Sequence, residues 1–206
     1  MRVLVVTEWC PRYQEVANVS LPNMYEYCAR HDYGYHEIKL TNEEGFHYKK
    51  HEFFKEVFEK GVYDLVWYKD IDSMITNLSV PIESFIDDEH DLFICGDDIF
   101  GINGGSLIIK NNIGGRFVNE FILRERGDFN NEQEVMEHYK EELQACSYMK
   151  ILPHPSINSY PYKEYPELKQ VTREQGNWHE GDFLLHCPAL PYEKRAEILR
   201  NAKIVR

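Results

Sequence analysis

Short apolar runs alternate with amphipathic segments through the first hundred residues, and this alternation limits the possible folds more than any other feature. The run RVLVVT (2–7) is typical of a strand that is buried on both faces of a sheet. The segments at 35–40 and 64–69 predict two further strands, and helical patterns over 22–31 and 49–60 separate the three. This order is typical of an α/β protein with a mostly parallel central sheet flanked by helices.

The rest of the chain continues this mixed pattern less regularly. Further elements are expected as strands at 92–96, 106–110 and 183–187 and as helices at about 114–124, 131–143 and 192–202. Residues 153–182 form a long irregular stretch with four prolines and several tyrosines, and loops of this length are usually functional or disordered. No internal repeat or linker interrupts the sequence, so we predict one domain over residues 1–206.

The amino-acid composition limits which classes of molecule the protein can bind and in which compartment it is expected. The formal net charge of −12 argues against nucleic acid or an anionic membrane as the main partner. An anionic small substrate would need a local positive group to overcome this field, and a bound cation is the simplest one. The five cysteines form no CxxC pair, so free thiols in a reducing compartment are expected. No stretch approaches the roughly 18 apolar residues of a membrane helix, and MRVLVVT is typical of a strand rather than a signal peptide, which predicts a cytoplasmic protein.

The segment WYKDIDSMITN (67–77) ends an apolar strand with two carboxylates, those of Asp70 and Asp72. Alternate residues of an extended chain point to the same side, so the two carboxylates would repel each other unless a cation lay between them. Carboxylates bind hard cations, and an added imidazole shifts the preference toward Mn²⁺. His186, near the end of the strand expected at 183–187, could supply that imidazole. A solvated loop or a helix cap would explain the aspartates without a metal, and a structural role would explain the histidine.

Other polar side chains are expected at the same edge of the sheet. Ligands of open α/β sheets bind beyond the carboxyl ends of the strands. The other residues at such ends are Thr7, Glu8, Trp9, Asp97 and Asp98. Several separate elements would therefore deliver polar groups to one place.

Four segments, taken in order, resemble one family of enzymes. WYKDIDSMITN, FGINGGSLIIKNN, NNEQEV and FLLHCPAL are similar to four motifs of GT-A fold nucleotide-sugar glycosyltransferases of the galactosyl/xylosyltransferase family, which includes mannan and xyloglucan enzymes. Those motifs are a D-x-D after an aromatic strand, an N-x-G segment, an acidic-Gln pair and a His before a small-residue turn. NMYEYCARHDYGYHEI and KKHEFFKEVFEK also match, so the resemblance covers most of the chain and thins over 150–180. The chain also resembles glycosyltransferase domains of large algal-virus proteins, which would place it in a host cytoplasm.

The resemblance implies a single Rossmann-like GT-A domain that carries out a metal-dependent sugar transfer. About residues 1–100 would form the nucleotide-binding half, and about residues 101–206 the donor-sugar and acceptor half. Asp70, Asp72 and His186 would bind Mn²⁺, or Mg²⁺, which would hold the diphosphate of a UDP-sugar and stabilise the charge on the departing UDP. A hydroxyl of a glycan or glycoconjugate would be the acceptor, with no nucleic acid and no membrane insertion.

The same resemblance assigns residues to the nucleotide. Thr7 and the loop after it would contact uridine, and Trp9 or Tyr13 could stack on the uracil or could simply pack within that loop. Lys49 or Lys50 would approach the donor phosphates at a helix N-terminus, although solvated lysines on a helix are common.

The donor sugar and the chemistry are assigned to a second group. Asn103, Gly104 and Gly105 would line the sugar, because glycines let the backbone approach a ligand closely, or they would form an ordinary turn. The candidate acids and bases are Asp97, Asp98 and Glu132, and the family more often has Asp at the position of Glu132.

The acceptor side is expected in the irregular stretch. His154 and the tyrosine-rich residues 160–165 could present aromatic faces to a sugar ring, or could only seal a loop onto the core.

Two other classes of function stay open from the residues alone. A metal-dependent phosphohydrolase would also place carboxylates at strand ends, usually with more His and Asp ligands and often with two metals. A non-catalytic nucleotide-sugar-binding module would keep the site without a catalytic base. A dinucleotide-binding fold is disfavoured, because TEWCPRY stands after the first strand where G-x-G-x-x-G would be needed.

Overall fold

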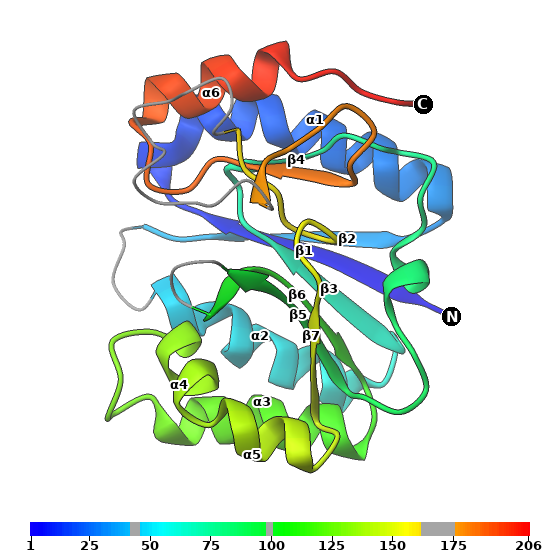
Figure 1. Cartoon of the computed structure of the whole chain (residues 1–206), viewed down its shortest axis with the longest axis vertical. Helices are drawn as coiled ribbons and strands as arrows, with labels where there is room; N and C mark the ends of the chain where they lie inside the picture. The colour runs from blue at the N-terminus through cyan, green and yellow to red at the C-terminus, as the bar shows by residue number, and fades with distance from the viewer. Residues whose placement is uncertain (42–45, 98–100, 162–175) are drawn as a thin grey trace.

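The computed structural model describes residues 1–41, 46–97, 101–161 and 176–206. Its centre is a six-stranded sheet in the order β2-β1-β3-β6-β5-β7, with helices on both sides (Figure 1). The strands of this sheet are β1 (Val3–Trp9), β2 (Gly34–Lys39), β3 (Leu65–Lys69), β5 (Leu92–Asp97), β6 (Gly101–Lys110) and β7 (Met149–Leu152).

All strands of this sheet except β6 run in the same direction. β1 pairs in parallel with β2 and β3, and β5 pairs in parallel with β7. β6 is antiparallel to both of its neighbours, β3 and β5. The predicted α/β class with a mostly parallel sheet is therefore confirmed, and the carboxyl ends of β1 and β3 lie side by side at one edge.

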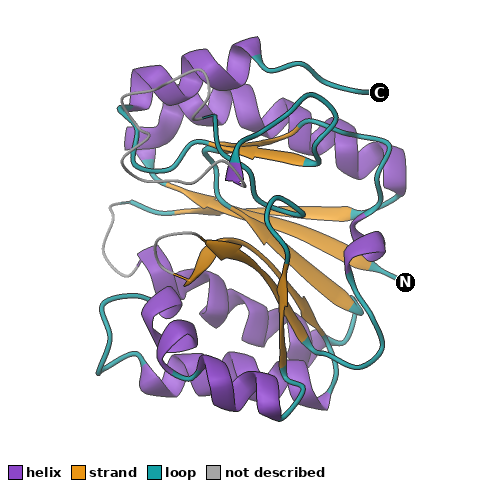
Figure 2. Ribbon diagram, in the orientation of Figure 1, coloured by secondary structure: helices purple, strands orange, loops and turns teal. Residues whose placement is uncertain are grey.

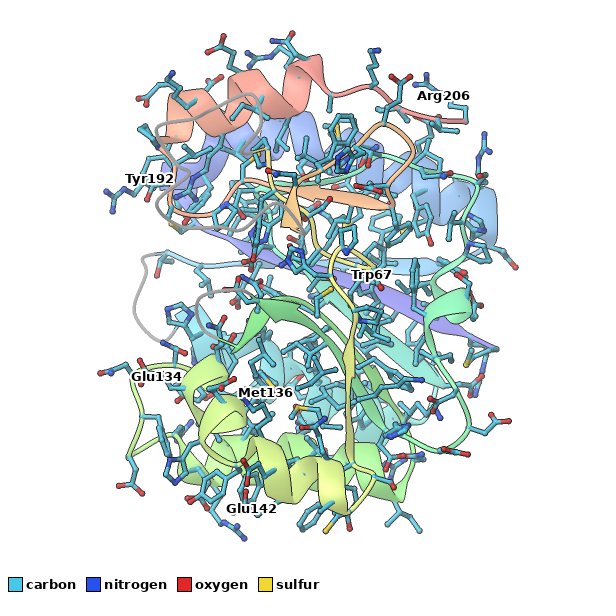
Figure 3. The ribbon with its side chains drawn as sticks, viewed as in Figure 1. Trp67, Glu134, Met136, Glu142, Tyr192 and Arg206 are labelled. Carbon is cyan, nitrogen blue, oxygen red and sulfur yellow. The ribbon has the colours of Figure 1, made fainter. Side chains whose placement is uncertain are left out.

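The helices form two groups (Figure 2). On one side of the sheet α1 (Gln14–His31) packs against α6 (Tyr192–Asn201). The helices of the other side are α2 (Phe46–Lys60), α3 (Ile113–Glu125), α4 (Glu132–His138) and α5 (Lys140–Ala145). Alternate residues of β3 face the two groups: Tyr68 packs with the α2–α5 group, and Trp67 packs with α1. Trp67 is fully buried in the middle of the molecule (Figure 3).

A two-stranded antiparallel ribbon lies beside the central sheet on the α1 side. Its strands are β4 (Ser73–Ile75) and β8 (Leu184–His186), and Ser73 pairs with His186. Ser20, buried inside α1, donates its hydroxyl to the carbonyl oxygen of Ser73 at 2.7 Å, which fixes the ribbon to the helix. The ribbon turns the chain immediately after β3 and brings a distant part of the sequence to that point.

Several element boundaries differ from the sequence prediction. α1 begins at Gln14 rather than at 22, and Pro22 lies inside it. Val16 and Ala17 are fully buried, so the burial of this face extends the helix past a proline that is more common in a first turn. β7 was not predicted, because four residues are too few to show a period. The helix expected over 131–143 is divided at Tyr139, where α4 ends and α5 begins.

No helix within the described ranges is long and apolar enough to cross a membrane. All five cysteines are free, as predicted.

Candidate functional site

Asp70, Asp72 and His186 form a compact cluster at the carboxyl end of β3. One potential ligand atom from each side chain lies within 4.8 Å of the others. His186 Nε2 is 3.5 Å from Asp70 Oδ2 and 3.3 Å from Asp72 Oδ1. The three residues expected to share a metal ion therefore lie together.

A turn and a strand pair bring these three residues together. The turn over 70–73 is closed by a hydrogen bond from the Ser73 amide to the Asp70 carbonyl oxygen (3.2 Å), and the Ser73 hydroxyl donates to the same oxygen (2.7 Å). The pairing of β4 with β8 then sets His186 opposite Ser73, next to Asp72. The two aspartates thus meet through a turn, not through the strand alternation that the sequence suggested.

His186 is held in one orientation by a buried amide. Its Nδ1 lies 2.9 Å from Asn158 Oδ1, and an amide oxygen can only accept, so Nδ1 carries a proton. Its Nε2 is buried and has no hydrogen bond among the described residues. This nitrogen is the one that faces Asp70 and Asp72.

The two aspartates are also oriented by neighbours. The Tyr68 hydroxyl donates to Asp70 Oδ1 at 2.7 Å, and Arg195 Nη1 donates to Asp72 Oδ2 at 2.7 Å. Each aspartate therefore keeps its other oxygen turned toward His186. Such supporting contacts are typical of a metal site.

The charges of the cluster shift its protonation equilibria. Burial disfavours the charged form of His186, but the carboxylates of Asp72 and Asp70 outweigh burial and raise its pKa to about 9. Burial also opposes the ionisation of Asp70, yet the neighbouring His186, the charge of Lys50 and the hydrogen bond from Tyr68 hold the pKa of Asp70 well below its usual range. A proton on His186 thus occupies the position between the two carboxylates where a cation would fit.

The backbone of β6 closes over the cluster at Gly105. The Asp70 amide donates to the Gly105 carbonyl oxygen at 2.7 Å. A Cβ at Gly105 would lie 2.4 Å from His186 Cε1 and 2.7 Å from Asp70 Oδ2, so any side chain there would displace two of the three residues. The segment GINGGS (101–106) lies within β6, so of the two possibilities that the sequence allowed, a ligand-lining segment or an ordinary turn, it does not form the turn. The donor set, the unpartnered Nε2 and this close approach fit a divalent cation such as Mn²⁺.

A cavity of about 350 Å³ opens beside the cluster, between β6 and the start of α4. Lys50 and Glu132, whose side chains are each 3% exposed, form an ion pair of 2.5 Å in its wall, and the Lys50 ammonium lies 4.1 Å from the centroid of the Tyr68 ring. Glu132 Oε2 has no hydrogen bond among the described residues. Gln133 Oε1 accepts the Gly104 amide at 2.9 Å. Other lining residues include Asp70 and His186 of the cluster and His47, Asn103, Gly105 and Glu134.

A second cavity of about 190 Å³ adjoins the cluster on the α6 side. Its lining includes Tyr13 and Arg195, and the Arg195 guanidinium lies 5.5 Å and 5.1 Å from the ring centroids of Tyr13 and Tyr192. Figure 3 shows Tyr192, at the start of α6, and Glu134, near the start of α4, at one edge of the molecule on opposite sides of the sheet. Because Asp70 and His186 line both cavities, the two cavities adjoin at the cluster and together form the candidate site.

Three residues predicted to bind the donor lie outside both cavities. Lys49 is exposed and pairs with Glu52 at 2.8 Å. Trp9 packs in a small apolar cluster, and its Nε1 donates to Glu37 Oε2 at 3.1 Å. Thr7 is fully buried within β1, and its hydroxyl has no hydrogen bond among the described residues.

The remaining predicted residues have separate places. Asp97, at the end of β5, accepts a hydrogen bond of 2.5 Å from the Tyr160 hydroxyl and lines neither cavity. The His154 ring lies 5.2 Å from the Tyr160 ring, between centroids. Asp98 and the part of the tyrosine-rich stretch at 162–165 lie outside the described residues.

Several residues reach the site without having been predicted, and Arg195 and Asn158 contact the cluster directly. Arg195 lies in YEKRAEILR, where dense charge indicates a solvated helix face, yet it is 9% exposed and contacts Asp72. Asn158 lies in the irregular stretch, where no periodic pattern marks which side chains point inward. In both cases the partner lies far away in the sequence, so a local pattern gives no signal.

Solved structures share this architecture at low sequence identity. A glycosyltransferase involved in the glycosylation of the major capsid of PBCV-1 aligns with a TM-score of 0.76 and 17% identity, over 97% of this chain and 98% of that chain. The galactosyltransferase LgtC, in complex with donor and acceptor sugar analogs, aligns with a TM-score of 0.53 and 10% identity, over 98% and 97%. A mutant of Drosophila β-1,4-galactosyltransferase 7, in complex with manganese, UDP-Gal and xylobiose, aligns with a TM-score of 0.50 and 11% identity, over 95% and 74%. The fold is that of the GT-A glycosyltransferases, as predicted.

The sequence identifies the family within this fold. Residues 82–195, more than half of the chain, match the galactosyl transferase GMA12/MNN10 family. The chain belongs to this family, so it is a glycosyltransferase by family and fold, and the resemblance drawn from its motifs is confirmed. No curated protein sequence is significantly similar to the chain.

Proposed function

We propose that this protein transfers a sugar from a UDP-sugar to a hydroxyl of a glycan or glycoconjugate, in a reaction that depends on a divalent cation. The observation that carries the proposal is the Asp70, Asp72 and His186 cluster, in which two carboxylate oxygens and an unpartnered imidazole nitrogen converge. This donor set suits Mn²⁺, with Mg²⁺ as a second candidate. The complex of the Drosophila enzyme with manganese and UDP-Gal supports the choice by fold.

The nucleotide is assigned to the α6 side of the site. When bound, the cation supplies charge that neutralises the diphosphate and the departing UDP. Arg195 adds a guanidinium to the smaller cavity, and Tyr13 adds an aromatic face. These are the groups that a phosphate and a uracil ring would contact.

The donor sugar is assigned to the larger cavity. Gly104 and Gly105 let the backbone of β6 approach a ligand closely, and Glu132 lines the same space. Lys50 holds Glu132 in place by their ion pair. Glu132 is therefore a better candidate than Asp97 to act on the sugar or on the acceptor hydroxyl, because Asp97 lines neither cavity. In this assignment, the two halves 1–100 and 101–206 act as one domain around one site.

A pair of isosteric substitutions tests the proposal. Asp72→Asn should abolish Mn²⁺-dependent UDP binding without unfolding the protein, because it removes one anionic ligand and keeps the shape. Glu132→Gln should leave UDP binding intact and slow UDP release from UDP-sugars by roughly 10²–10⁴-fold, the range of a general acid or base. Calorimetry with UDP and Mn²⁺, and UDP release from a panel of UDP-sugars, provide the two measurements.

The matched controls are Asp64→Asn and Glu142→Gln, because Asp64 and Glu142 are exposed. Both variants should behave as the wild type does. Unchanged metal-dependent binding in Asp72→Asn would remove Asp72 from the site, and full UDP release in Glu132→Gln would exclude Glu132 from the chemistry. UDP binding without any release by the wild type would favour the non-catalytic module. Turnover of simple phosphoesters without UDP would favour the phosphohydrolase.

A further inference from the structure

A chain of hydrogen bonds runs from the metal-ligand cluster to Asp97. The Tyr160 hydroxyl donates to Asp97 Oδ2 at 2.5 Å, and Asn158 Nδ2 lies 3.0 Å from the Tyr160 oxygen. Asn158 Oδ1 then lies 2.9 Å from His186 Nδ1. Asn158, Tyr160 and His186 are all buried, so water does not compete for the two bonds between them.

Backbone hydrogen bonds hold the residues of this hydrogen-bonded series in place. The His186 amide donates to the Ser159 carbonyl oxygen at 2.7 Å, and the Tyr160 amide donates to the Gly176 carbonyl oxygen at 2.8 Å. The segment 158–160 therefore lies against β8, with Asn158 facing the imidazole. The side chains can reorient, but the elements that carry them cannot separate without breaking these bonds.

The carboxylate of Asp97 sets which group donates and which accepts in each of these hydrogen bonds. A carboxylate accepts hydrogen bonds and has no proton to donate, so Tyr160 must donate to it and has only lone pairs left for Asn158. Asn158 must then turn its NH₂ group toward Tyr160 and its oxygen toward His186. That oxygen accepts the proton on Nδ1, which leaves the lone pair of Nε2 for a cation.

Turning the Asn158 amide over would reverse each link. The NH₂ group of Asn158 would face His186 Nδ1, which would have to accept, and neutral His186 would then carry its proton on Nε2, between the carboxylates. Tyr160 would donate to the amide oxygen, and Asp97 would lose the proton that Tyr160 donates to it. In the first arrangement neutral His186 leaves the cation site open, and in the second it blocks the site.

We propose that Asp97 and Tyr160 are positioning residues that act through Asn158 to keep His186 in the form whose Nε2 binds the divalent cation. This inference rests on the proposed function, because it requires the metal site. It gives Asp97 a role in metal binding in place of the acid–base role that the sequence suggested. Residues that orient a metal ligand in this way typically change metal affinity by 10–100-fold when they are replaced.

The first test is the Mn²⁺ affinity of the full chain with UDP present, measured from the electron paramagnetic resonance signal of free Mn²⁺. Asn158→Leu should weaken binding by roughly 10–100-fold, and Asp97→Asn and Tyr160→Phe by about 10-fold. Tyr33→Phe is the matched control, because it removes another hydroxyl that donates to a carboxylate, that of Glu83, away from the site. The control should bind Mn²⁺ as the wild type does.

A rescue experiment separates orientation from general damage. Asn158→Asp supplies a carboxylate that accepts from Nδ1 without help from Tyr160 or Asp97, so its Mn²⁺ affinity should remain near that of the wild type. Adding Asp97→Asn to this variant should then have no further effect. If Asp97→Asn weakened Mn²⁺ binding as much in the Asn158→Asp variant as it does in the wild type, the proposal would be overturned.

Nitrogen NMR tests the proposal on the wild type, so this test does not depend on whether a variant folds. In protein with ¹⁵N-labelled histidine, Mg²⁺ and UDP, His186 should show a proton on Nδ1 and none on Nε2, with the signal identified by its loss in His186→Gln. A proton on Nε2 would overturn the proposal, as would Asp97→Asn with normal Mn²⁺ affinity and reduced transfer. If the wild type binds no Mn²⁺ with UDP, the proposed function and this inference fail together; if it binds and the variants match it, the inference alone fails.

Discussion

Glu8 shows how far the protein environment can alter a single carboxyl group. It is fully buried at the end of β1, and burial raises its pKa to about 8. Its Oε1 lies 3.3 Å from the hydroxyl of Tyr68, which donates its proton to Asp70 at 2.7 Å. A protonated Glu8 can donate to that hydroxyl oxygen, so the neutral form completes the network beneath the site.

Glu8→Gln should therefore change how stability depends on pH. Between pH 4.5 and about 8 the unfolded chain loses the Glu8 proton and the folded chain keeps it, so this group lowers wild-type stability by up to about 1.4 kcal/mol for each pH unit. Glutamine does not titrate, so the free energy of unfolding of the variant should rise relative to the wild type as pH increases. Urea unfolding at several pH values measures this difference; a difference that stays constant would contradict a raised pKa.

At the scale of the element, β6 decides the shape of the site, because its glycines let the backbone touch the cluster. Gly105→Ala should greatly weaken Mn²⁺ binding, because the added Cβ would fall 2.4 Å from His186 Cε1. Gly127→Ala is the matched control, since a Cβ there meets nothing within 4 Å. Calorimetric titration with Mn²⁺ in the presence of UDP compares the two variants. Equal affinities would show that β6 does not form part of the metal site.

The same strand shows what the sequence could and could not predict. The apolar run SLIIK (106–110) predicted the buried part of β6, because burial leaves a clear pattern. The segment GINGGS has turn composition, and its extension as a strand depends on pairing with β5, which no local rule contains. α1 likewise starts early because one face is buried by elements distant in the sequence.

At the scale of the whole molecule, the motifs predicted the cluster better than its surroundings. Asp70, Asp72 and His186 were predicted because strand ends and a family motif mark them. Arg195 and Asn158 were not, because each acquires its place from a contact with a distant residue: Arg195 with Asp72, and Asn158 with His186. The net charge of −12 also acts at this scale, since an acidic protein would need a local positive group to bind the anionic donor that we propose.

Thermal unfolding of the wild type with UDP and UDP-sugars, each with Mn²⁺, Mg²⁺ or EDTA, tests the central claim most directly. A ligand at a hundred times its dissociation constant adds about 2.7 kcal/mol, which should raise the midpoint by roughly 5–10 °C for a domain of this size. The account predicts this shift when UDP and Mn²⁺ are present together, and little or none with UDP and EDTA. A shift with UDP that is equally large in EDTA, or no shift with any uridine nucleotide and Mn²⁺, would contradict it.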